Sequence, residues 1–246
     1  MTMNRRAPIA DQSTQRPSRS VVLRSGIVLL TAAVGIIGVM WLCGTLLVDG
    51  AVPPLTRLDT STTEWVVARR TPLLDTLTLG TMMADTIVAL IVAAVAVVAL
   101  RWWLGRWRES LIVVVAIVGE LLIFLAITAL VHRDRPSVPR LDQAPPTSGF
   151  PSGHTGAAVA IYACLAVLLL CTVPRRPLAR ALAAVGFAIP IIVAASRVYR
   201  GMHYLTDVVA GAIASGIWIA VVLAVLLRAA PAGQPSANGE SRRAAP

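Results

Sequence analysis

The chain has 246 residues, of which 57% are hydrophobic and 14% charged, and its mean hydropathy is +0.75. A soluble domain is about half apolar and roughly a quarter charged, so this composition excludes an ordinary soluble protein and indicates an integral membrane protein. The formal net charge of +10 is carried by arginine alone, since the sequence contains no lysine. These arginines lie in tails and loops, which indicates membrane topology and not a nucleic-acid partner.

Both ends of the chain differ in composition from the middle. Residues 1–24 are polar, basic and rich in Ser, Pro and Thr, and residues 229–246 are rich in Ala, Pro and Gly. Such segments are typical of disordered tails. We therefore expect one membrane domain over residues 25–228. Its first apolar run, 25–48, is longer than the roughly 7–15 residues of a signal-peptide core and predicts a retained membrane helix.

Six apolar stretches are long enough to cross a bilayer, which takes about 20 residues. They cover residues 25–48, 82–100, 110–132, 155–173, 181–198 and 205–228. The predicted fold is an all-α, polytopic bundle of six transmembrane helices. The connection before residue 82 is long enough for one or two short amphipathic helices at the membrane interface.

The connections differ in charge, and this predicts the orientation. RWWLGRWR and PRRPLAR, after the second and fourth spans, are very short and carry only positive charge. With six spans they lie on the same side as both tails, which the positive-inside rule makes cytoplasmic. The other three connections then face outward, although they carry arginines too. High Ala and Arg without Lys suggests a GC-rich bacterial genome, and hence a bacterial plasma membrane.

The outward connection before the fourth span ends in PSGHTGAA. Ser152 is a favourable N-cap for the apolar helix that follows, and Gly153 allows a ligand to approach the backbone. The free N–H groups of a helix start attract anions. His154 would lie in the first turn, where it can donate or accept a proton. Ordinary helix capping with an interfacial histidine explains this stretch equally well when it is taken alone.

The last outward connection, SRVYRGMHYLTD, places His203 and Asp207 four residues apart, so on a helix the two side chains can touch. A carboxylate on one imidazole nitrogen fixes the tautomer and makes the other nitrogen a better nucleophile. Arg197 supplies a planar fork that matches phosphate oxygens. The alternatives are an interfacial salt bridge, or a metal site formed by His154, His203 and Asp207. The surrounding arginines disfavour a cation.

A third outward segment, HRDRP at residues 132–136, adds Arg135 as a second phosphate clamp. Each motif alone is weak, but together they place two arginines, a helix start and two histidines on one side of the membrane. Arginines and N–H groups can hold phosphate charge while one histidine attacks phosphorus and the other protonates the leaving oxygen. This is the equipment for phosphoryl transfer without a metal or other cofactor.

The three motifs together resemble the type 2 phosphatidic acid phosphatase (PAP2) family, whose superfamily includes bacterial acid phosphatases and vanadium haloperoxidases. The resemblance covers about residues 59–228 and is carried by Arg135-Pro136, Pro151-Ser152-Gly153-His154, and Ser196-Arg197 followed by His203 and Asp207. It implies that His203 is the nucleophile, that His154 is the general acid and that Asp207 orients His203. The phosphate-binding residues that it implies are Arg135, Ser152, Gly153 and Arg197.

One position departs from the family pattern. The first family motif begins with a lysine seven residues before its Arg-Pro arginine, and this chain has Thr128 there. No lysine elsewhere can replace it. Either Arg133 or Arg200 supplies the missing charge, or the site binds phosphate with one cation fewer.

The expected function is that of a membrane phosphatase that hydrolyses a lipid phosphate monoester or diphosphate through a phosphohistidine, without a metal. Polyprenyl diphosphate, phosphatidic acid and phosphatidylglycerol phosphate are the candidate substrates, and the oligomeric state stays open. A phosphotransferase that passes the phosphoryl group to another acceptor needs the same residues. A non-hydrolytic transporter or binder of lipid headgroups is the alternative from another class, but it has no need of two histidines and a carboxylate.

Overall fold

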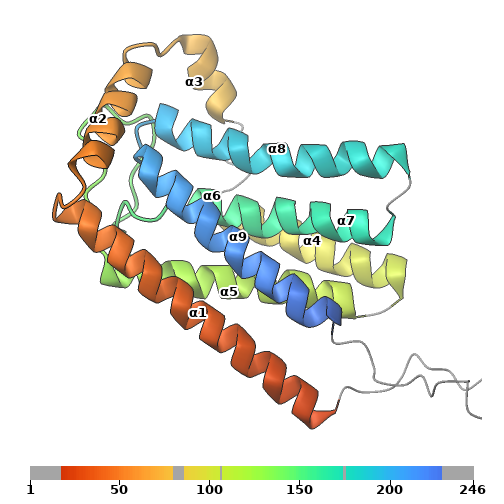
Figure 1. Ribbon diagram of the computed structural model, residues 1–246. Helices are drawn as coiled ribbons and strands as arrows, with labels where there is room; N and C mark the ends of the chain where they lie inside the picture. Colours follow the sequence, from red (N-terminus) through yellow and green to blue (C-terminus); the bar gives the residue numbers. More distant parts are fainter. Residues whose placement is uncertain (1–17, 80–85, 106, 174–175, 229–246) are drawn as a thin grey trace, which may run out of the picture.

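The computed structural model describes residues 18–79, 86–105, 107–173 and 176–228, and over these residues the chain is helical without any strand (Figure 1). The helical segments in chain order are α1 (Arg19–Val48), α2 (Pro53–Val67), α3 (Pro72–Leu79), α4 (Thr86–Leu104), α5 (Arg108–Leu130), α6 (Gly153–Ala158), the π-helical turn η3 (Val159–Ala163), α7 (Cys164–Thr172), α8 (Pro177–Tyr199) and α9 (Leu205–Arg228).

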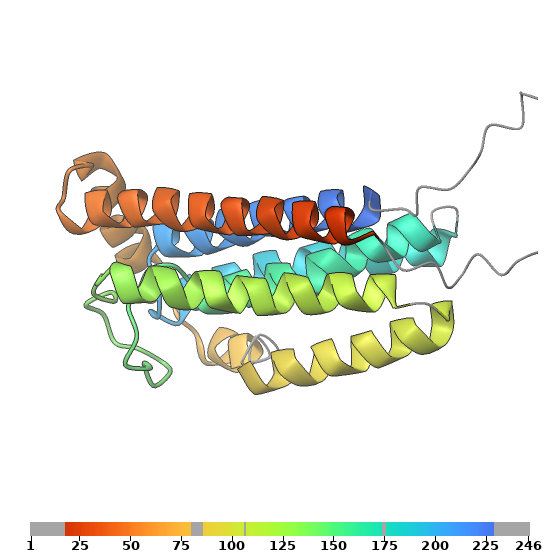
Figure 2. The same cartoon turned by 90° about the horizontal axis from the view of Figure 1, so that it is seen from below.

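Five of these helices are long and apolar enough to cross a membrane. They are α1, α5, α8, α9 and the continuous helix Gly153–Thr172 formed by α6, η3 and α7. The apolar part of α4, Val88–Leu104, is shorter and supplies the sixth long element. The six run side by side in Figures 1 and 2. The prediction of an all-α, multi-pass membrane bundle is confirmed.

The helix bounds differ from the predicted ones mainly at two places. α1 begins at Arg19, so residues 19–24, which we expected in a disordered tail, are helical; Ser18 Oγ caps the helix by accepting from Val21 N. α4 ends at Leu104, four residues beyond the predicted end, and the predicted start at residues 82–85 lies outside the described residues. The remaining tail predictions, for residues 1–17 and 229–246, lie outside the described residues.

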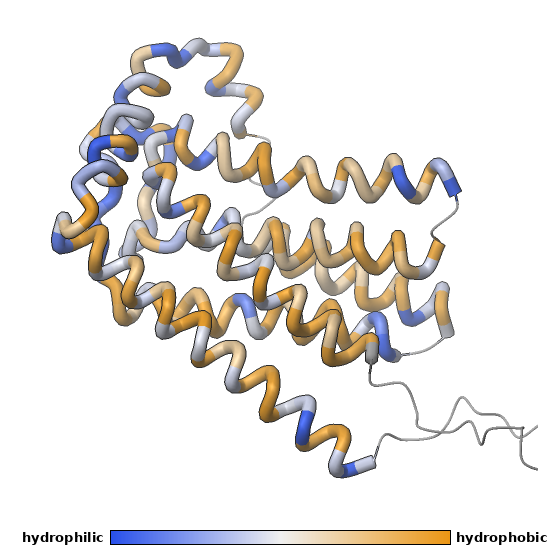
Figure 3. The backbone as a smooth tube through the Cα atoms, in the orientation of Figure 1, coloured by the Kyte–Doolittle hydropathy of each residue, from blue (hydrophilic) through white to orange (hydrophobic). Residues whose placement is uncertain are grey.

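The core joins α1, α5, α7 and α9 mainly through buried aliphatic side chains, with Phe150 and Trp218. Trp218 Nε1 donates to Ala116 O at 3.0 Å. Gly119 makes room for the indole, because a Cβ there would lie 2.1 Å from the ring. Many large apolar side chains also cover the outside of the bundle, as Figure 3 shows by colour. An apolar exterior over hydrogen-bonded helices is what a lipid environment requires.

One end of the bundle carries the polar residues, and we call it the site end. It consists of α2, α3, the loop 131–152 and the turn 200–204 between α8 and α9 (Figures 1 and 3). α2 and α3 are the short helices expected in the connection after α1. Arg70, between α2 and α3, donates through Nε and Nη2 to Tyr199 O and through Nη1 to Pro139 O, so it fastens the α2–α3 segment to α8 and the loop.

Candidate active site

The turn between α8 and α9 places His203 inside the site end. Arg200 caps α8, and Gly201 turns the chain with φ +72°, a conformation that favours glycine. Met202 N then donates to Arg197 O at 3.0 Å, which closes the turn. His203 follows and is only 4% exposed, although its motif is rich in charge.

The two ring nitrogens of His203 have different partners. Nδ1 lies 2.8 Å from Gly149 O, and Nε2 lies 3.3 Å from Arg135 Nη1. A carbonyl oxygen only accepts, so Nδ1 carries the proton and Nε2 keeps its lone pair. Burial and the Arg135 charge lower the pKa of His203 to about 3. The imidazole is therefore neutral at neutral pH, with the lone pair of Nε2 beside an arginine.

Asp207, which we expected to orient His203, lies near the ring but is not hydrogen-bonded to it. Its Oδ2 is 3.9 Å from His203 Nδ1, beyond hydrogen-bond range. That oxygen accepts from Tyr204 N at 2.7 Å, and Oδ1 accepts from Arg133 Nη1 at 2.5 Å. The direct partner of Nδ1 is the carbonyl of Gly149, a residue that sequence reasoning did not single out.

Asp207 belongs to a buried group that we call the inner cluster, formed by Asp59, Arg133 and Asp207. Arg133 Nη2 donates to Asp59 Oδ2 at 2.7 Å, so one guanidinium lies between two carboxylates. Asp59 also accepts from Thr206 N at 2.9 Å and from Thr206 Oγ1 at 2.5 Å. The inner cluster thus joins α2, the loop and the first turn of α9.

Sequence reasoning did not single out Asp59, which lies in the connection where we expected short amphipathic helices at the membrane interface. The structure buries it completely, at 0% exposure, together with Thr63 one turn further along α2. Its partner Arg133 is 74 residues away in the chain. The only local signal was a carboxylate and a threonine at i, i+4 in a helix that begins at the membrane interface, and that pattern is common on exposed faces as well.

A second group, the outer cluster, consists of Asp142, Arg197 and Arg200. Arg200 donates to both carboxylate oxygens of Asp142, from Nε at 2.7 Å and from Nη2 at 2.5 Å. Arg197 Nη1 lies 3.3 Å from Asp142 Oδ2. The hydrogen bond from Arg200, with the charge of Arg197, holds the pKa of Asp142 below its usual value. One ionised carboxylate therefore lies between two arginines, and its side chain is 18% exposed.

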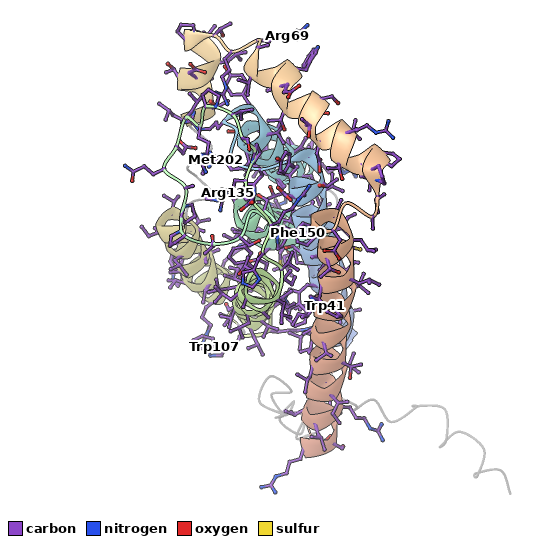
Figure 4. The ribbon with its side chains drawn as sticks, turned by 90° about the vertical axis from the view of Figure 1, so that its left-hand side faces the viewer. Trp41, Arg69, Trp107, Arg135, Phe150 and Met202 are labelled. Carbon is purple, nitrogen blue, oxygen red and sulfur yellow. The ribbon has the colours of Figure 1, made fainter. Side chains whose placement is uncertain are left out.

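A cavity of about 240 Å³ lies next to both clusters and connects a polar end to an apolar wall. The polar end is lined by Arg135, Arg197, His154 and His203, with Gly153 at the start of α6. Figure 4 looks onto this end of the molecule, where Arg135, Met202 and Phe150 lie near the middle of the bundle. The charged end of the cavity can hold an anion in direct reach of His203 Nε2.

The apolar wall of the cavity comes from α4, α5 and the helix that begins at Gly153. Its residues are Ala89, Leu90, Ile117, Leu121, Phe124, Ala157 and Ile161. Leu90 is 53% exposed and Leu121 is 40% exposed on the outside of the bundle. The cavity therefore reaches the lipid-facing surface between α4 and α5, where an acyl or prenyl chain can lie. Glu120, which also lines it, is hydrogen-bonded to Ser215 of α9.

The structure brings together some of the predicted site residues and not others. His203, His154, Arg135, Arg197 and Gly153 line the same cavity. Five other residues that the sequence pointed to do not line it: Thr128, Arg133, Ser152, Arg200 and Asp207.

Ser152 instead caps α6 and binds the backbone of α9. Its Oγ caps α6 by accepting from Thr155, and its backbone N–H donates to Asp207 O at 2.9 Å. Gly211 of α9 permits this contact, because a Cβ there would lie 2.5 Å from Ser152 O. Arg133 and Arg200, the two residues suggested as replacements for the missing lysine, are held by carboxylates in the inner and outer clusters.

Metal ligands do not gather in the part of the chain that the structure describes: no group of three or more His, Cys, Asp or Glu side chains there could hold an ion. His154, His203 and Asp207, considered above as a zinc site, are not grouped in this way.

The bundle and its cavity define a multi-pass membrane protein in which two histidines and two arginines line one cavity. The family model of the PAP2 superfamily matches residues 109–230, the part of the chain that supplies all of these histidines and arginines. The chain belongs to this superfamily, as its three motifs predicted.

Two solved structures share the fold. One is the first transmembrane PAP2 type phosphatidylglycerolphosphate phosphatase from Bacillus subtilis, which is 21% identical over 76% of this chain and 94% of its own, with a TM-score of 0.68. The other is LpxE from Aquifex aeolicus, 20% identical over 69% of this chain and 95% of its own, with a TM-score of 0.54. Likeness at these identities shows the fold alone. No curated protein sequence matches the chain.

Proposed function

We propose that this protein is a membrane phosphatase that removes a phosphoryl group from a lipid phosphate monoester or diphosphate. The observation that carries the proposal is the state of His203. Its Nδ1–H is held by Gly149 O, its Nε2 lies 3.3 Å from Arg135 Nη1, and its ring lines a cavity together with two arginines and a second histidine. A neutral imidazole fixed in this tautomer is a nucleophile aimed at an anion site.

In the proposed reaction, His203 Nε2 attacks phosphorus and the bond from phosphorus to the leaving oxygen breaks. His154 donates a proton to that oxygen, and a phosphohistidine is left on His203. Water, with its proton taken by His154, then breaks the P–N bond and releases inorganic phosphate. Arg135 and Arg197 offset the charge that gathers on the phosphoryl oxygens in both steps.

The groups behind His203 fit this chemistry. Once Nε2 is bonded to phosphorus, the imidazole becomes cationic, and Nδ1–H remains hydrogen-bonded to Gly149 O. The carboxylate of Asp207 lies 3.9 Å from the same nitrogen, within range to stabilise that positive charge. Asp207 would therefore act on His203 through its field, while the Gly149 carbonyl sets the tautomer.

The apolar wall, open between α4 and α5, suits a lipid substrate. Phosphatidic acid, phosphatidylglycerol phosphate and polyprenyl diphosphate share the required combination of a phosphoryl end and long apolar chains. The name of the structural relative from Bacillus subtilis makes phosphatidylglycerol phosphate a natural first choice for assay. From the placement of arginines we place the site end outside the cytoplasm, with both termini inside, in a bacterial plasma membrane.

The test is release of phosphate from lipid phosphates by the purified full-length protein in detergent micelles. We expect activity in wild type and in His132→Ala, which alters the third, exposed histidine, and none in His203→Ala. Activity that survives in His203→Ala would refute the nucleophile. Binding of lipid phosphate without any release in wild type would favour a transporter or binder.

The same assay tests whether a metal is needed. We expect EDTA to leave the rate unchanged, because the proposed steps use only side chains of the chain and water. Loss of activity in EDTA with recovery on adding zinc would instead support a metal site around His154 and His203.

A further inference from the structure

The charge that faces the cavity is smaller than the number of motif arginines suggests. Arg133 belongs to the inner cluster, where two carboxylates surround it, and it does not line the cavity. Within the described residues, the hydrogen-bond partners of Arg135 include no carboxylate: they are Met202 O, Thr147 Oγ1, Ser148 O and His203 Nε2. Arg135 therefore contributes one full positive charge.

The outer cluster contributes one more positive charge to the cavity. Arg197 lines the cavity and Arg200 lies behind it, and Asp142 binds both, so two positive charges and one negative charge leave a surplus of +1. The negative field of Asp142 also reaches His154. Arg135 and the outer cluster thus give two positive charges. The proton that His154 donates in the proposed reaction adds a third, and the inner cluster behind His203 has one negative charge in excess, so the total is about +2. A phosphate monoester carries about −1.5 to −2 at pH 7, so the two match.

A diphosphate would need a second cationic position on the side of the lipid chain. If its outer phosphorus lies at His203 Nε2, the inner phosphate lies between the polar end and the apolar wall. Among the described residues that line this part, the only ionisable side chain is Glu120, which cannot supply a positive charge. Residues 80–85, outside the described part, contain no arginine or lysine. Arg140 is exposed on the loop and does not line the cavity.

We infer, on the basis of the proposed function, that the substrate is a lipid phosphate monoester and that Asp142 is a specificity-determining residue that disfavours a diphosphate. Asp142 takes up one of the positive charges that an additional phosphate would require. Its negative charge beside Arg197 also lowers the positive potential of the cavity, which disfavours a diphosphate more than a monoester because the diphosphate carries more negative charge. The loss of the family lysine at Thr128 acts in the same direction.

The test compares two lipids that differ only in the number of phosphates, phosphatidic acid and diacylglycerol diphosphate, with the purified full-length protein in the same mixed micelles. Phosphate release gives kcat/KM for each. We expect wild type to favour the monoester by at least about tenfold, equal to about 1.4 kcal/mol. Equal rates, or a preference for the diphosphate, would overturn the inference and leave the proposed phosphatase activity intact. No release from either lipid would overturn the proposed function itself.

Asp142→Asn then tests the residue. It keeps the size of the side chain and one oxygen acceptor for Arg200, but removes the negative charge. We expect the monoester-to-diphosphate ratio to fall at least about threefold from its wild-type value, mainly through a higher kcat/KM for the diphosphate. The control is Asp49→Asn, which removes an exposed carboxylate after α1 and should leave the ratio unchanged.

A ratio in Asp142→Asn equal to that of wild type, in protein that elutes as a single species, would refute the role of Asp142. If this variant does not fold, the wild-type ratio still decides whether the site selects monoesters.

Discussion

The inner and outer clusters have opposite net charges. The inner cluster has one arginine between two carboxylates, with Asp59 and Asp207 fully buried. The outer cluster has one carboxylate between two arginines, and Asp142 keeps 18% of its side chain exposed. The surplus negative charge thus lies behind His203, and the surplus positive charge lies where a phosphate would bind.

The comparison teaches that a motif arginine shows its role only through its partners. Arg133 and Arg135 are two residues apart in HRDRP. Burial acts to lower the pKa of both, but Asp207 and Asp59 outweigh burial at Arg133 and raise its pKa, whereas the pKa of Arg135 falls. The first arginine joins helices, and the second faces the cavity. The following predictions separate these two kinds of arginine and the two clusters, from the largest effect to the smallest.

Arg133→Met should have the largest effect on folding. It leaves Asp59 and Asp207 buried without a cation, which typically costs about 3–5 kcal/mol. We expect little folded protein, measured as the monodisperse fraction in detergent and by thermal unfolding. Arg135→Met is the matched comparison, because it removes no carboxylate partner and should abolish phosphate release while leaving the protein folded. Equal melting of Arg133→Met and wild type would show that the inner cluster does not hold the helices together.

Asp59→Asn should weaken the inner cluster without destroying it. The amide oxygen can still accept from Thr206 N, but the charge pair with Arg133 is lost, and we expect a cost of about 1–3 kcal/mol in unfolding free energy. Because Arg133 then binds Asp207 alone, the field at His203 changes, and kcat should fall several-fold with KM nearly constant. A change in KM alone would place Asp59 in substrate binding instead.

Acid should destabilise the fold through His203. Its pKa is about 3 in the folded protein and near 6.5 for a free histidine, so between these values the unfolded chain binds a proton that the folded one does not. The contribution of His203 to the unfolding free energy, taken as the difference between wild type and His203→Asn, should therefore fall as the pH drops from 6.5 to 4.5, by up to about 1.4 kcal/mol per pH unit. Melting curves at both pH values should show a shallower loss for His203→Asn. An identical slope would mean that His203 is charged in the fold.

Asp142→Asn should have the smallest effect on stability, under about 1 kcal/mol, because a partly exposed ion pair gains little over solvation. Arg200 also keeps its bonds to Asp75 O and Thr78 Oγ1. Thermal unfolding of the variant should nearly superimpose on that of wild type. A loss of unfolding free energy as large as that expected for Arg133→Met would show that the two clusters contribute equally to stability.

The membrane helices and the cavity residues were predictable because their signals are local. Twenty or so apolar residues in a row identify α5 or α9, and His154, His203, Arg135 and Arg197 each stand in a short motif of fixed spacing. The start of α1 was missed because arginine and serine at its first turns read as tail composition. The N-terminal turns of α1 thus extend beyond the apolar run that begins at residue 25.

The partners of these residues were not predictable, because the contacts join distant parts of the chain. Asp59 meets Arg133 across 74 residues, Asp142 meets Arg200 across 58, and Gly149 O meets His203 across 54. Nothing near these positions marks them: Asp59 stands in an amphipathic helix, and Asp142 and Gly149 in a Pro- and Ser-rich loop. Only the packing of α2 and of the loop on α8 and α9 brings them to the site.

The opening of the cavity between Leu90 and Leu121 has a kinetic consequence for the proposed activity. A substrate that enters sideways from the bilayer is encountered by diffusion in two dimensions. The rate should then follow the mole fraction of lipid phosphate in the membrane and not its amount per volume of solution. Adding inert phospholipid at constant total substrate should slow turnover, while adding more buffer should not.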